Sequence, residues 1–336
     1  MNNLIPNFGI SDNETNDPVH SFIAAPGFVL NESGLIVAAR TRTLLWSENG
    51  GKSWQIALEN LNLSEPLTIT ALAVSENFSQ NPHIFAGSAG GVLRSIDGAH
   101  QWKIIPFSAP PPVISILKVS PNYARDETIF AGTMEDGILI SQDCGESWVS
   151  WNFGLLDRNI ISLAISPNFK NDESIFAGTE SGIFRSTNGG RAWCEVDLPF
   201  GFEPVICLEF DPGYAENHTL YAGTENLGLW VSIDEGETWS RLGVDKIVST
   251  VNQIFISEKS GVRYLLIATG EALWLSDDAG IHWEKCLSGS YSDHEISAVL
   301  APEGIWPGAC LMVGYTNGFI KTVIIESETR FKASNS

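Results

Sequence analysis

Apolar and polar positions follow one fixed order that repeats along most of the chain. Each copy begins with an apolar run that ends near a proline, as in ISILKVSP and ISLAISP, and continues with two small-residue runs, as in IFAGTESGIFRS. A polar turn and a tryptophan segment complete the copy. Short apolar runs separated by glycine and polar turn residues predict β-strands. Each copy therefore predicts a strand, a loop, a strand, a tight turn, a third strand, a second turn and a fourth strand.

The second turn of each copy carries the motif Ser-x-Asp/Asn-x-Gly-x-x-Trp, which we call the box. Six copies occur: SENGGKSW, SIDGAHQW, SQDCGESW, STNGGRAW, SIDEGETW and SDDAGIHW, and only the second departs, with Ala99 in place of glycine. Their closing tryptophans recur every 44 to 48 residues. This spacing is typical of one four-stranded propeller blade per copy.

The box residues predict a structural role. The Asp or Asn side chain can accept backbone N–H groups within its own turn, the glycine permits a conformation closed to other residues, and the tryptophan covers the end of the hairpin. Calcium would need about six to eight oxygen ligands, whereas each box supplies one or two, so no metal is expected. The predicted structural residues are Asn49, Asp97, Asp143, Asn188, Asp234 and Asp278, with Trp54, Trp102, Trp148, Trp193, Trp239 and Trp283.

The repeated box resembles the BNR or Asp-box repeat family of β-propellers. Members of that family include sialidases, xyloglucanases, sortilin-type receptors and the photosystem II assembly factor of oxygenic phototrophs. The resemblance covers about residues 20 to 325. It implies a propeller fold, but because one fold hosts many functions, it does not by itself imply an activity.

The copies predict one all-β domain over residues 1–336, a seven-bladed propeller of four-stranded antiparallel blades. The six boxes define blades at about 21–60, 68–106, 113–152, 160–198, 204–243 and 248–288, and residues 295–325 match the first three strands of a seventh. Segment 1–12 could supply the missing strand and so protect the last blade from an exposed edge, and 326–336 would be a tail.

Composition excludes several classes of protein. The 40 acidic and 19 basic residues give a formal net charge of -21, which opposes nucleic-acid binding because DNA and RNA are themselves anionic. The same charge fits either simple solubility or a cationic partner. The five cysteines lack metal or disulfide spacing, and the six histidines lie singly, so no cofactor is expected. The N-terminal segment lacks the pattern of a secretory signal and no apolar run is long enough to span a membrane, so we expect a cytoplasmic protein.

The candidate binding residues lie on one face. In a propeller, turns between the second and third strands share a face with the connections between blades, whereas the boxes lie on the other. Loops must be solvated, so polar turns are also expected without any function. The turn residues predicted to contact a partner are Arg40, Arg42, Glu135, Asp136, Glu180, Glu225 and Glu271.

The connections between blades on that face are rich in aromatic residues and proline: PFSAPPPV, WNFGLLDRNI and LPFGFEPV. Exposed aromatic residues are typical of protein interfaces, but the same residues could instead fill the seams between blades. The candidates are Phe107, Trp151, Phe153, Arg158, Phe200 and Phe202.

Catalytic signatures of the resembled enzymes are missing. Sialidases imply an arginine triad, an Arg-Ile-Pro segment and a Tyr-Glu pair, and no Arg-Ile-Pro occurs; Arg94, Arg185 and Arg191 adjoin boxes instead. A xyloglucanase-like glycosidase would need two acids across a cleft, for which Asp136 and Glu225 are candidates, but that family places the cleft between two propellers. The photosystem assembly factor implies an arginine-rich patch, which is not evident here.

The sequence therefore predicts a non-catalytic scaffold that binds other proteins, as a subunit or accessory factor of a larger assembly. The alternative is a glycoside hydrolase or a carbohydrate-binding propeller. An enzyme should gather acids, arginine and tyrosine in one pocket, whereas the aromatic residues here are spread over several blades.

Overall fold

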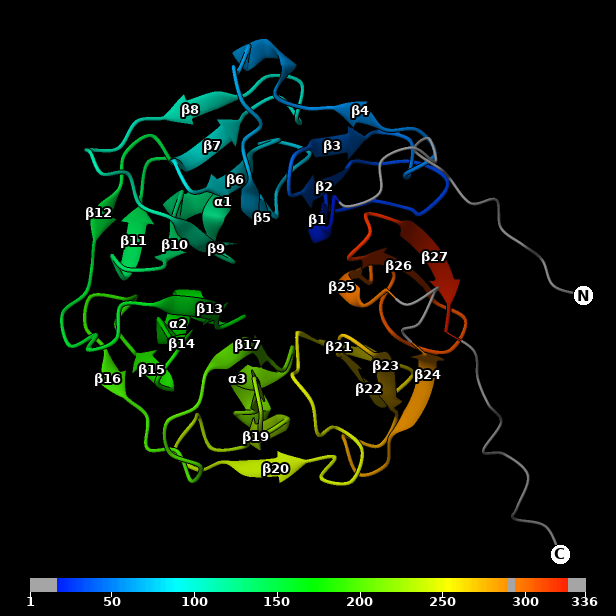
Figure 1. Ribbon diagram of the computed structural model, residues 1–336. Coiled ribbons are helices and arrows are strands. Elements are labelled where there is room, and N and C mark those ends of the chain that lie inside the picture. Colours follow the sequence, from blue (N-terminus) through cyan, green and yellow to red (C-terminus); the bar gives the residue numbers. More distant parts are fainter. Residues whose placement is uncertain (1–16, 289–293, 326–336) are drawn as a thin grey trace, which may run out of the picture.

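The computed structural model describes residues 17–288 and 294–325, which form a ring of seven antiparallel sheets (Figure 1). The predicted all-β, seven-bladed propeller is confirmed. Six sheets have four strands in sequence order from the centre outwards, and the described part of the seventh has three. The segment predicted to close the seventh blade, residues 1–12, lies outside the described residues. No helix in the described ranges is long and apolar enough to cross a membrane.

The strands of the first four blades have the following bounds. Blade 1 consists of β1 (Val19–Ala24), β2 (Ile36–Arg40), β3 (Leu44–Ser47) and β4 (Gln55–Ile56). Blade 2 consists of β5 (Ile69–Val74), β6 (Ile84–Ser88), β7 (Gly91–Ser95) and β8 (Lys103–Ile105). Blade 3 consists of β9 (Ile114–Val119), β10 (Ile129–Thr133), β11 (Ile138–Ser141) and β12 (Val149–Ser150). Blade 4 consists of β13 (Ile160–Ile165), β14 (Ile175–Thr179), β15 (Ile183–Ser186) and β16 (Cys194–Glu195).

The remaining blades and the helical turns complete the ring. Blade 5 consists of β17 (Val205–Phe210), β18 (Leu220–Thr224), β19 (Leu229–Ser232) and β20 (Ser240–Leu242). Blade 6 consists of β21 (Gln253–Lys259), β22 (Val262–Ala268), β23 (Ala272–Ser276) and β24 (Glu284–Ser288). Blade 7 consists of β25 (Ile296–Leu300), β26 (Cys310–Tyr315) and β27 (Ile320–Ile324). The helical elements are η1 (Glu59–Leu61), α1 (Tyr123–Asp126), α2 (Phe169–Asp172) and α3 (Tyr214–Asn217).

The hydrophobic core lies between neighbouring blades. The Ala-Gly pair in the second strands of blades 2 to 5, and the Val-Gly pair in that of blade 7, explain how closely these blades pack. A Cβ added to Gly132 of blade 3 would lie 2.5 Å from Cγ2 of Ile160, at the start of the inner strand of blade 4. Gly314 of blade 7 has the same relation to Val19 of blade 1, where the ring closes. Glycine is required at these positions because any side chain would separate the two blades.

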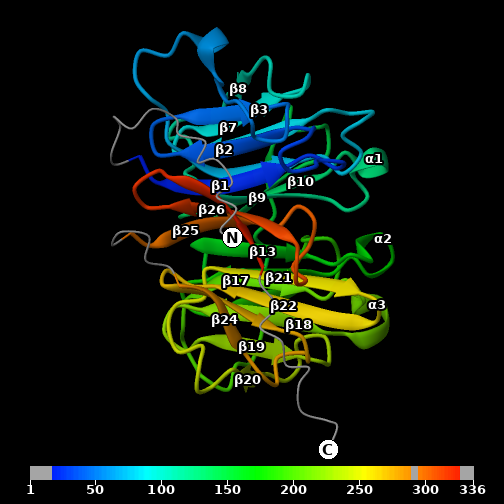
Figure 2. The same ribbon diagram turned by 90° about the vertical axis from the view of Figure 1, so that its right-hand side faces the viewer.

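The loops lie at opposite ends of the blades. Helices α1, α2 and α3 belong to the connections between first and second strands, and Figure 2 shows them along one side of the ring. The strands of a blade alternate in direction, so the boxes, between third and fourth strands, share that side. The second-to-third-strand turns and the connections between blades share the other side, which we call the turn face.

Candidate functional site

The connection from blade 3 to blade 4, residues 151–159, is fixed to both blades. Asn152 accepts the backbone N–H of Ile138 through Oδ1 at 2.8 Å and donates from Nδ2 to the carbonyl of Asp136 at 2.7 Å. The Arg158 carbonyl accepts the Gly137 N–H at 3.1 Å. Both ends of the connection are therefore held against the turn of blade 3.

The middle of the same connection is bound to blade 4. The Phe153 carbonyl accepts the backbone N–H of Trp193 at 2.8 Å. The Asp157 carboxylate accepts the Ser181 N–H at 3.0 Å and the Ser181 hydroxyl at 2.7 Å, which joins the connection to the next turn. Between these contacts, Phe153 is 80% exposed and Leu156 is 79% exposed. Two large apolar side chains thus stand in solvent on a backbone that is held in place.

The connection from blade 4 to blade 5 repeats this arrangement. The buried Glu203 carboxylate accepts the backbone N–H of Asn226, and the Pro204 carbonyl accepts the N–H of Glu225 at 3.1 Å. Phe200 packs on Trp230 with ring centroids 4.4 Å apart. Phe202, between these contacts, is 83% exposed. An exposed aromatic side chain on a fixed backbone is again the result.

A carboxylate clamp therefore recurs where the chain enters a blade. Asp17, next to blade 1, accepts the Arg42 N–H at 2.8 Å, as Asp157 does for Ser181 and Glu203 for Asn226. These three residues were not predicted from the sequence. Each is an acidic residue two or three positions before an inner strand, and without the strand register it cannot be distinguished from any other polar loop residue.

The structure divides the predicted aromatic candidates. Phe153 and Phe202 are exposed, whereas the other three are half-buried in seams. Phe107 packs near Trp148 and Phe200 packs on Trp230, and Trp151 lies against the core between blades 3 and 4. These three stabilise blade contacts because their rings find apolar neighbours on the adjoining strands.

The predicted charged residues also fall into two groups. Arg40 is buried and donates from Nη2 to the carbonyl of Gly318 in blade 7, so it belongs to the seam that closes the ring and does not face solvent. The others are exposed, namely Arg42, Glu135, Asp136, Arg158, Glu180, Glu225 and Glu271. Of the two arginines of blade 1 that were predicted to contact a partner, only Arg42 is therefore exposed to solvent.

Further exposed apolar side chains were missed because they are isolated in polar segments. Met134 is 49% exposed in the turn of blade 3, next to Glu135. Val244 and Val248 are 55% and 60% exposed in the connection from blade 5 to blade 6. Exposed apolar side chains therefore occur on turn-face segments from blade 3 to the start of blade 6. We call Met134, Phe153, Leu156 and Phe202 the turn-face set.

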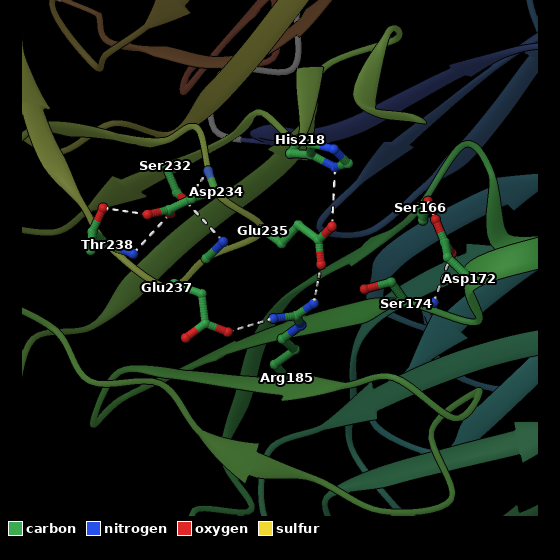
Figure 3. Close-up of polar contacts among 11 residues, drawn as sticks. Ser166, Asp172, Ser174, Arg185, His218, Ser232, Asp234, Glu235, Glu237 and Thr238 are labelled. Carbon is green, nitrogen blue, oxygen red and sulfur yellow. Dashed lines mark hydrogen bonds and ion pairs between the residues drawn. The ribbon is translucent and has the colours of Figure 1, made fainter. Parts of the chain in front are cut away.

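The box turns have a different chemistry, shown for blade 5 in Figure 3. Asp234 accepts the Ser232 hydroxyl at 2.8 Å and the Thr238 N–H at 2.9 Å through Oδ1, and the Thr238 hydroxyl at 2.6 Å through Oδ2. Hydrogen bonds from Thr238 lower the pKa of Asp234. Each of the six box Asp or Asn residues accepts the backbone N–H four positions later. The side-chain oxygens of these Asp and Asn residues are thus engaged by hydrogen bonds within their own turns.

An arginine before a box connects neighbouring blades. Arg185, 18% exposed, binds Glu235 at 2.8 Å and Glu237 at 3.1 Å in the next box (Figure 3). Arg94 binds Glu146 at 2.9 Å in the same way between blades 2 and 3. These arginines hold blades together, so they are not free to bind a substrate carboxylate. Within residues 17–288 and 294–325, no group of three or more His, Cys, Asp or Glu side chains could hold a metal ion.

No protein-family model and no curated protein matches the chain. Solved structures do resemble it. YCF48 bound to a D1 peptide is 15% identical with a TM-score of 0.63, and the match covers 93% of this chain and 95% of that chain. YCF48 from Cyanidioschyzon merolae is 14% identical with a TM-score of 0.60, over 91% and 95%. An ancestral GH74 enzyme is 19% identical with a TM-score of 0.71, over 92% of this chain but 45% of the enzyme.

These likenesses show a shared propeller fold. The neighbours include both a peptide-binding protein and a glycoside hydrolase, and the chain spans less than half of the latter. Identities below 20% carry no residue correspondence, so the chemistry of this chain depends on its own side chains.

Proposed function

We propose that this chain is a non-catalytic scaffold that binds another protein across the turn face of blades 3 to 5, as a subunit or accessory factor of a larger assembly. The observation that carries the proposal is the pair Phe153 and Phe202, both more than three-quarters exposed on connections that hydrogen bonds fix to the neighbouring blades. Large aromatic side chains held in one place lose little entropy on binding, and they are the residues that most often dominate protein interfaces.

The charge around this surface indicates the chemistry of the partner. Exposed acids stand in the turns of three successive blades, with Glu135 and Asp136 in blade 3, Glu180 in blade 4 and Glu225 in blade 5. The chain as a whole carries a formal net charge of -21. A partner segment with apolar side chains for the turn-face set and lysine or arginine for the acids would complement both features. The structural neighbour YCF48, solved with a D1 peptide, supports peptide binding by a propeller of this fold.

The test is affinity purification of the tagged protein from its native cells, followed by mass spectrometry. The variant carries Phe153→Ala, Leu156→Ala and Phe202→Ala. A matched control carries Ile96→Ala, Ile233→Ala and Ile281→Ala, which removes three exposed apolar side chains from box turns (54%, 71% and 74% exposed). We expect a partner retained by the control and lost from the turn-face variant, with both proteins folded by circular dichroism.

The competing activity is measured on the same preparations. A partner that the turn-face variant retains would contradict the proposed surface. Hydrolysis of a β-glucan or sialoside by the wild type, abolished by Asp136→Asn or Glu225→Gln, would replace the scaffold with a glycosidase.

A further inference from the structure

The inner strands of all seven blades surround the propeller axis (Figure 1). Residues of these strands and of their flanking loops line a cavity there. Its volume is about 480 Å³, and residues from every blade line it. Pockets for small ligands have volumes of about 300–1,000 Å³. The cavity is therefore large enough for a small organic molecule.

Two charges of opposite sign line this cavity at equivalent positions. Lys118 of β9 pairs with Phe130 in the sheet register, and Glu209 of β17 pairs with Tyr221, the residue of blade 5 that corresponds to Phe130. The intervening blade has Ala164 at the same position, opposite Phe176. Lys118 and Glu209 thus lie at one level of the ring, on either side of a small residue.

Neither charge is bonded to the protein. Among the residues that the structure describes, no hydrogen bond and no ion pair within 4 Å involves the side chain of Lys118 or Glu209. Burial raises the pKa of the Glu209 carboxyl, and the positive charge of Lys118 opposes this only in part. Both side chains are partly buried, and partly desolvated charges without a bonded partner destabilise a protein, so a pair left apart in a cavity requires a reason.

A third group in the cavity lacks a bond. The equivalent inner-strand side chains of two other blades donate across the seam, namely the Thr70 hydroxyl to the Ile114 carbonyl and the Ser115 hydroxyl to the Ile160 carbonyl. The buried Ser297 hydroxyl of blade 7 has no partner in the described part of the chain, and this residue too lines the cavity. The cavity wall therefore carries a cation, an anion and one residue whose buried hydroxyl has no partner.

We propose that the axial cavity binds a small zwitterion with an ammonium and a carboxylate group, namely a free amino acid or a dipeptide. The ligand carboxylate binds the Lys118 ammonium, and the ligand ammonium binds the Glu209 carboxylate. A ligand with a single charge would satisfy one protein charge and leave the other without a partner, which predicts selectivity for zwitterions. This site is separate from the turn face and does not depend on the proposed function.

The first experiment is isothermal titration calorimetry of the full chain with each of the twenty amino acids and with glycylglycine. The N-acetyl derivative and the methyl ester of the best ligand are then titrated, because each removes one of its two charges. We expect at least one zwitterion to bind, and both derivatives to bind at least tenfold more weakly. Comparison of the amino acids with glycylglycine identifies which length of zwitterion fits.

The second experiment changes the protein. Lys118→Met and Glu209→Gln should each weaken binding at least tenfold, and the exchange Lys118→Glu with Glu209→Lys should restore it, because the ligand can bind in the reverse direction. Lys170→Met and Glu195→Gln remove exposed charges elsewhere and should change nothing. The proposal is overturned if no zwitterion binds at millimolar concentration, or if folded Lys118→Met and Glu209→Gln proteins bind as the wild type does.

Discussion

At the scale of single residues, the box glycine explains why one position tolerates no side chain. Gly236 has a left-handed backbone with φ of 89°, and an added Cβ would lie 2.6 Å from Cε1 of Phe176 in the preceding blade. Gly236→Ala combines left-handed strain of about 1–2 kcal/mol with overpacking of about 1–3 kcal/mol. We therefore expect the free energy of unfolding, measured in urea, to fall by about 2 kcal/mol or more.

Gly261 provides the matched control for this substitution. Its φ is 77°, but nothing lies within 4 Å of an added Cβ. Gly261→Ala should therefore cost only the backbone strain, about 1 kcal/mol. Equal losses for the two variants would show that contact with Phe176 contributes nothing. In the second box Ala99 adopts φ of 77° at the equivalent position, so a methyl group can be accommodated where the preceding blade leaves room.

The box carboxylates predict a pH dependence. Hydrogen bonds from Thr238 lower the pKa of Asp234 below its ordinary value of 3.8, so the ionised form stabilises the folded state. That contribution is complete above the pKa of the unfolded chain and is lost as the pH falls through the lower pKa of the folded state. Asp234→Ala should cost about 1–2 kcal/mol at pH 7, and the difference from the wild type should narrow below about pH 3.8. Thermal unfolding between pH 2.5 and 7 measures this, with exposed Asp245→Ala as the control.

At the scale of elements, an arginine at the end of a third strand pairs with the next box. Arg185 of β15 binds Glu235 and Glu237, and its guanidinium lies 5.6 Å from the ring centre of Phe176. Arg185→Glu places a negative charge beside two others, so we expect the free energy of unfolding to fall by about 2 kcal/mol. Adding Glu237→Arg should restore part of the lost stability, with a coupling energy of about 1–3 kcal/mol in a double-mutant cycle.

The exposed pair Arg191–Glu173 is the comparison for that cycle. Its side chains are 55% and 46% exposed, so the same charge exchange should couple by less than about 1 kcal/mol. A coupling at Arg185 as small as this would mean that the pair does not help to hold blade 4 against blade 5.

The strands and blade number could be predicted because most blades repeat the same local signals, namely the apolar run, a small-residue second strand and, in six of the seven, the box. Which side chains of a connection are exposed could not be predicted from these signals. Trp151 and Phe153 are two residues apart, yet the former is half-buried and the latter exposed. What separates them is Trp193, about forty residues later, whose N–H and ring Nε1 bind the carbonyls of Phe153 and Trp151. The Asp157 and Glu203 clamps likewise depend on partners in the following blade, which a local pattern does not reveal.

At the scale of the whole molecule, the fold depends on one seam between the first and last described blades. Among the contacts that cross it, Val19 packs against Gly314 and the Arg40 side chain donates to the Gly318 carbonyl. The Gly318 backbone also lies so close to Asp17 that an added Cβ would be 2.7 Å from the Asp17 carbonyl oxygen. Arg40 and Gly318 are 278 positions apart, so this bond closes the ring over nearly the whole chain. Contacts of such long separation form late in folding, since most of the chain must already be ordered.

Arg40→Leu should therefore weaken the closure without disturbing the other blades. Removing the guanidinium leaves the Gly318 carbonyl without this donor in a buried seam, so we expect the free energy of unfolding to fall by about 1–3 kcal/mol. Hydrogen exchange followed by mass spectrometry should show faster exchange in peptides from β1, β26 and β27, and unchanged exchange in blades 3 to 5, because a broken seam opens the ring at its ends first. Exposed Arg42→Leu, which keeps the backbone bond to Asp17, is the control. Uniformly faster exchange around the ring would instead mean that the seven blades unfold as one unit and that the seam has no separate stability.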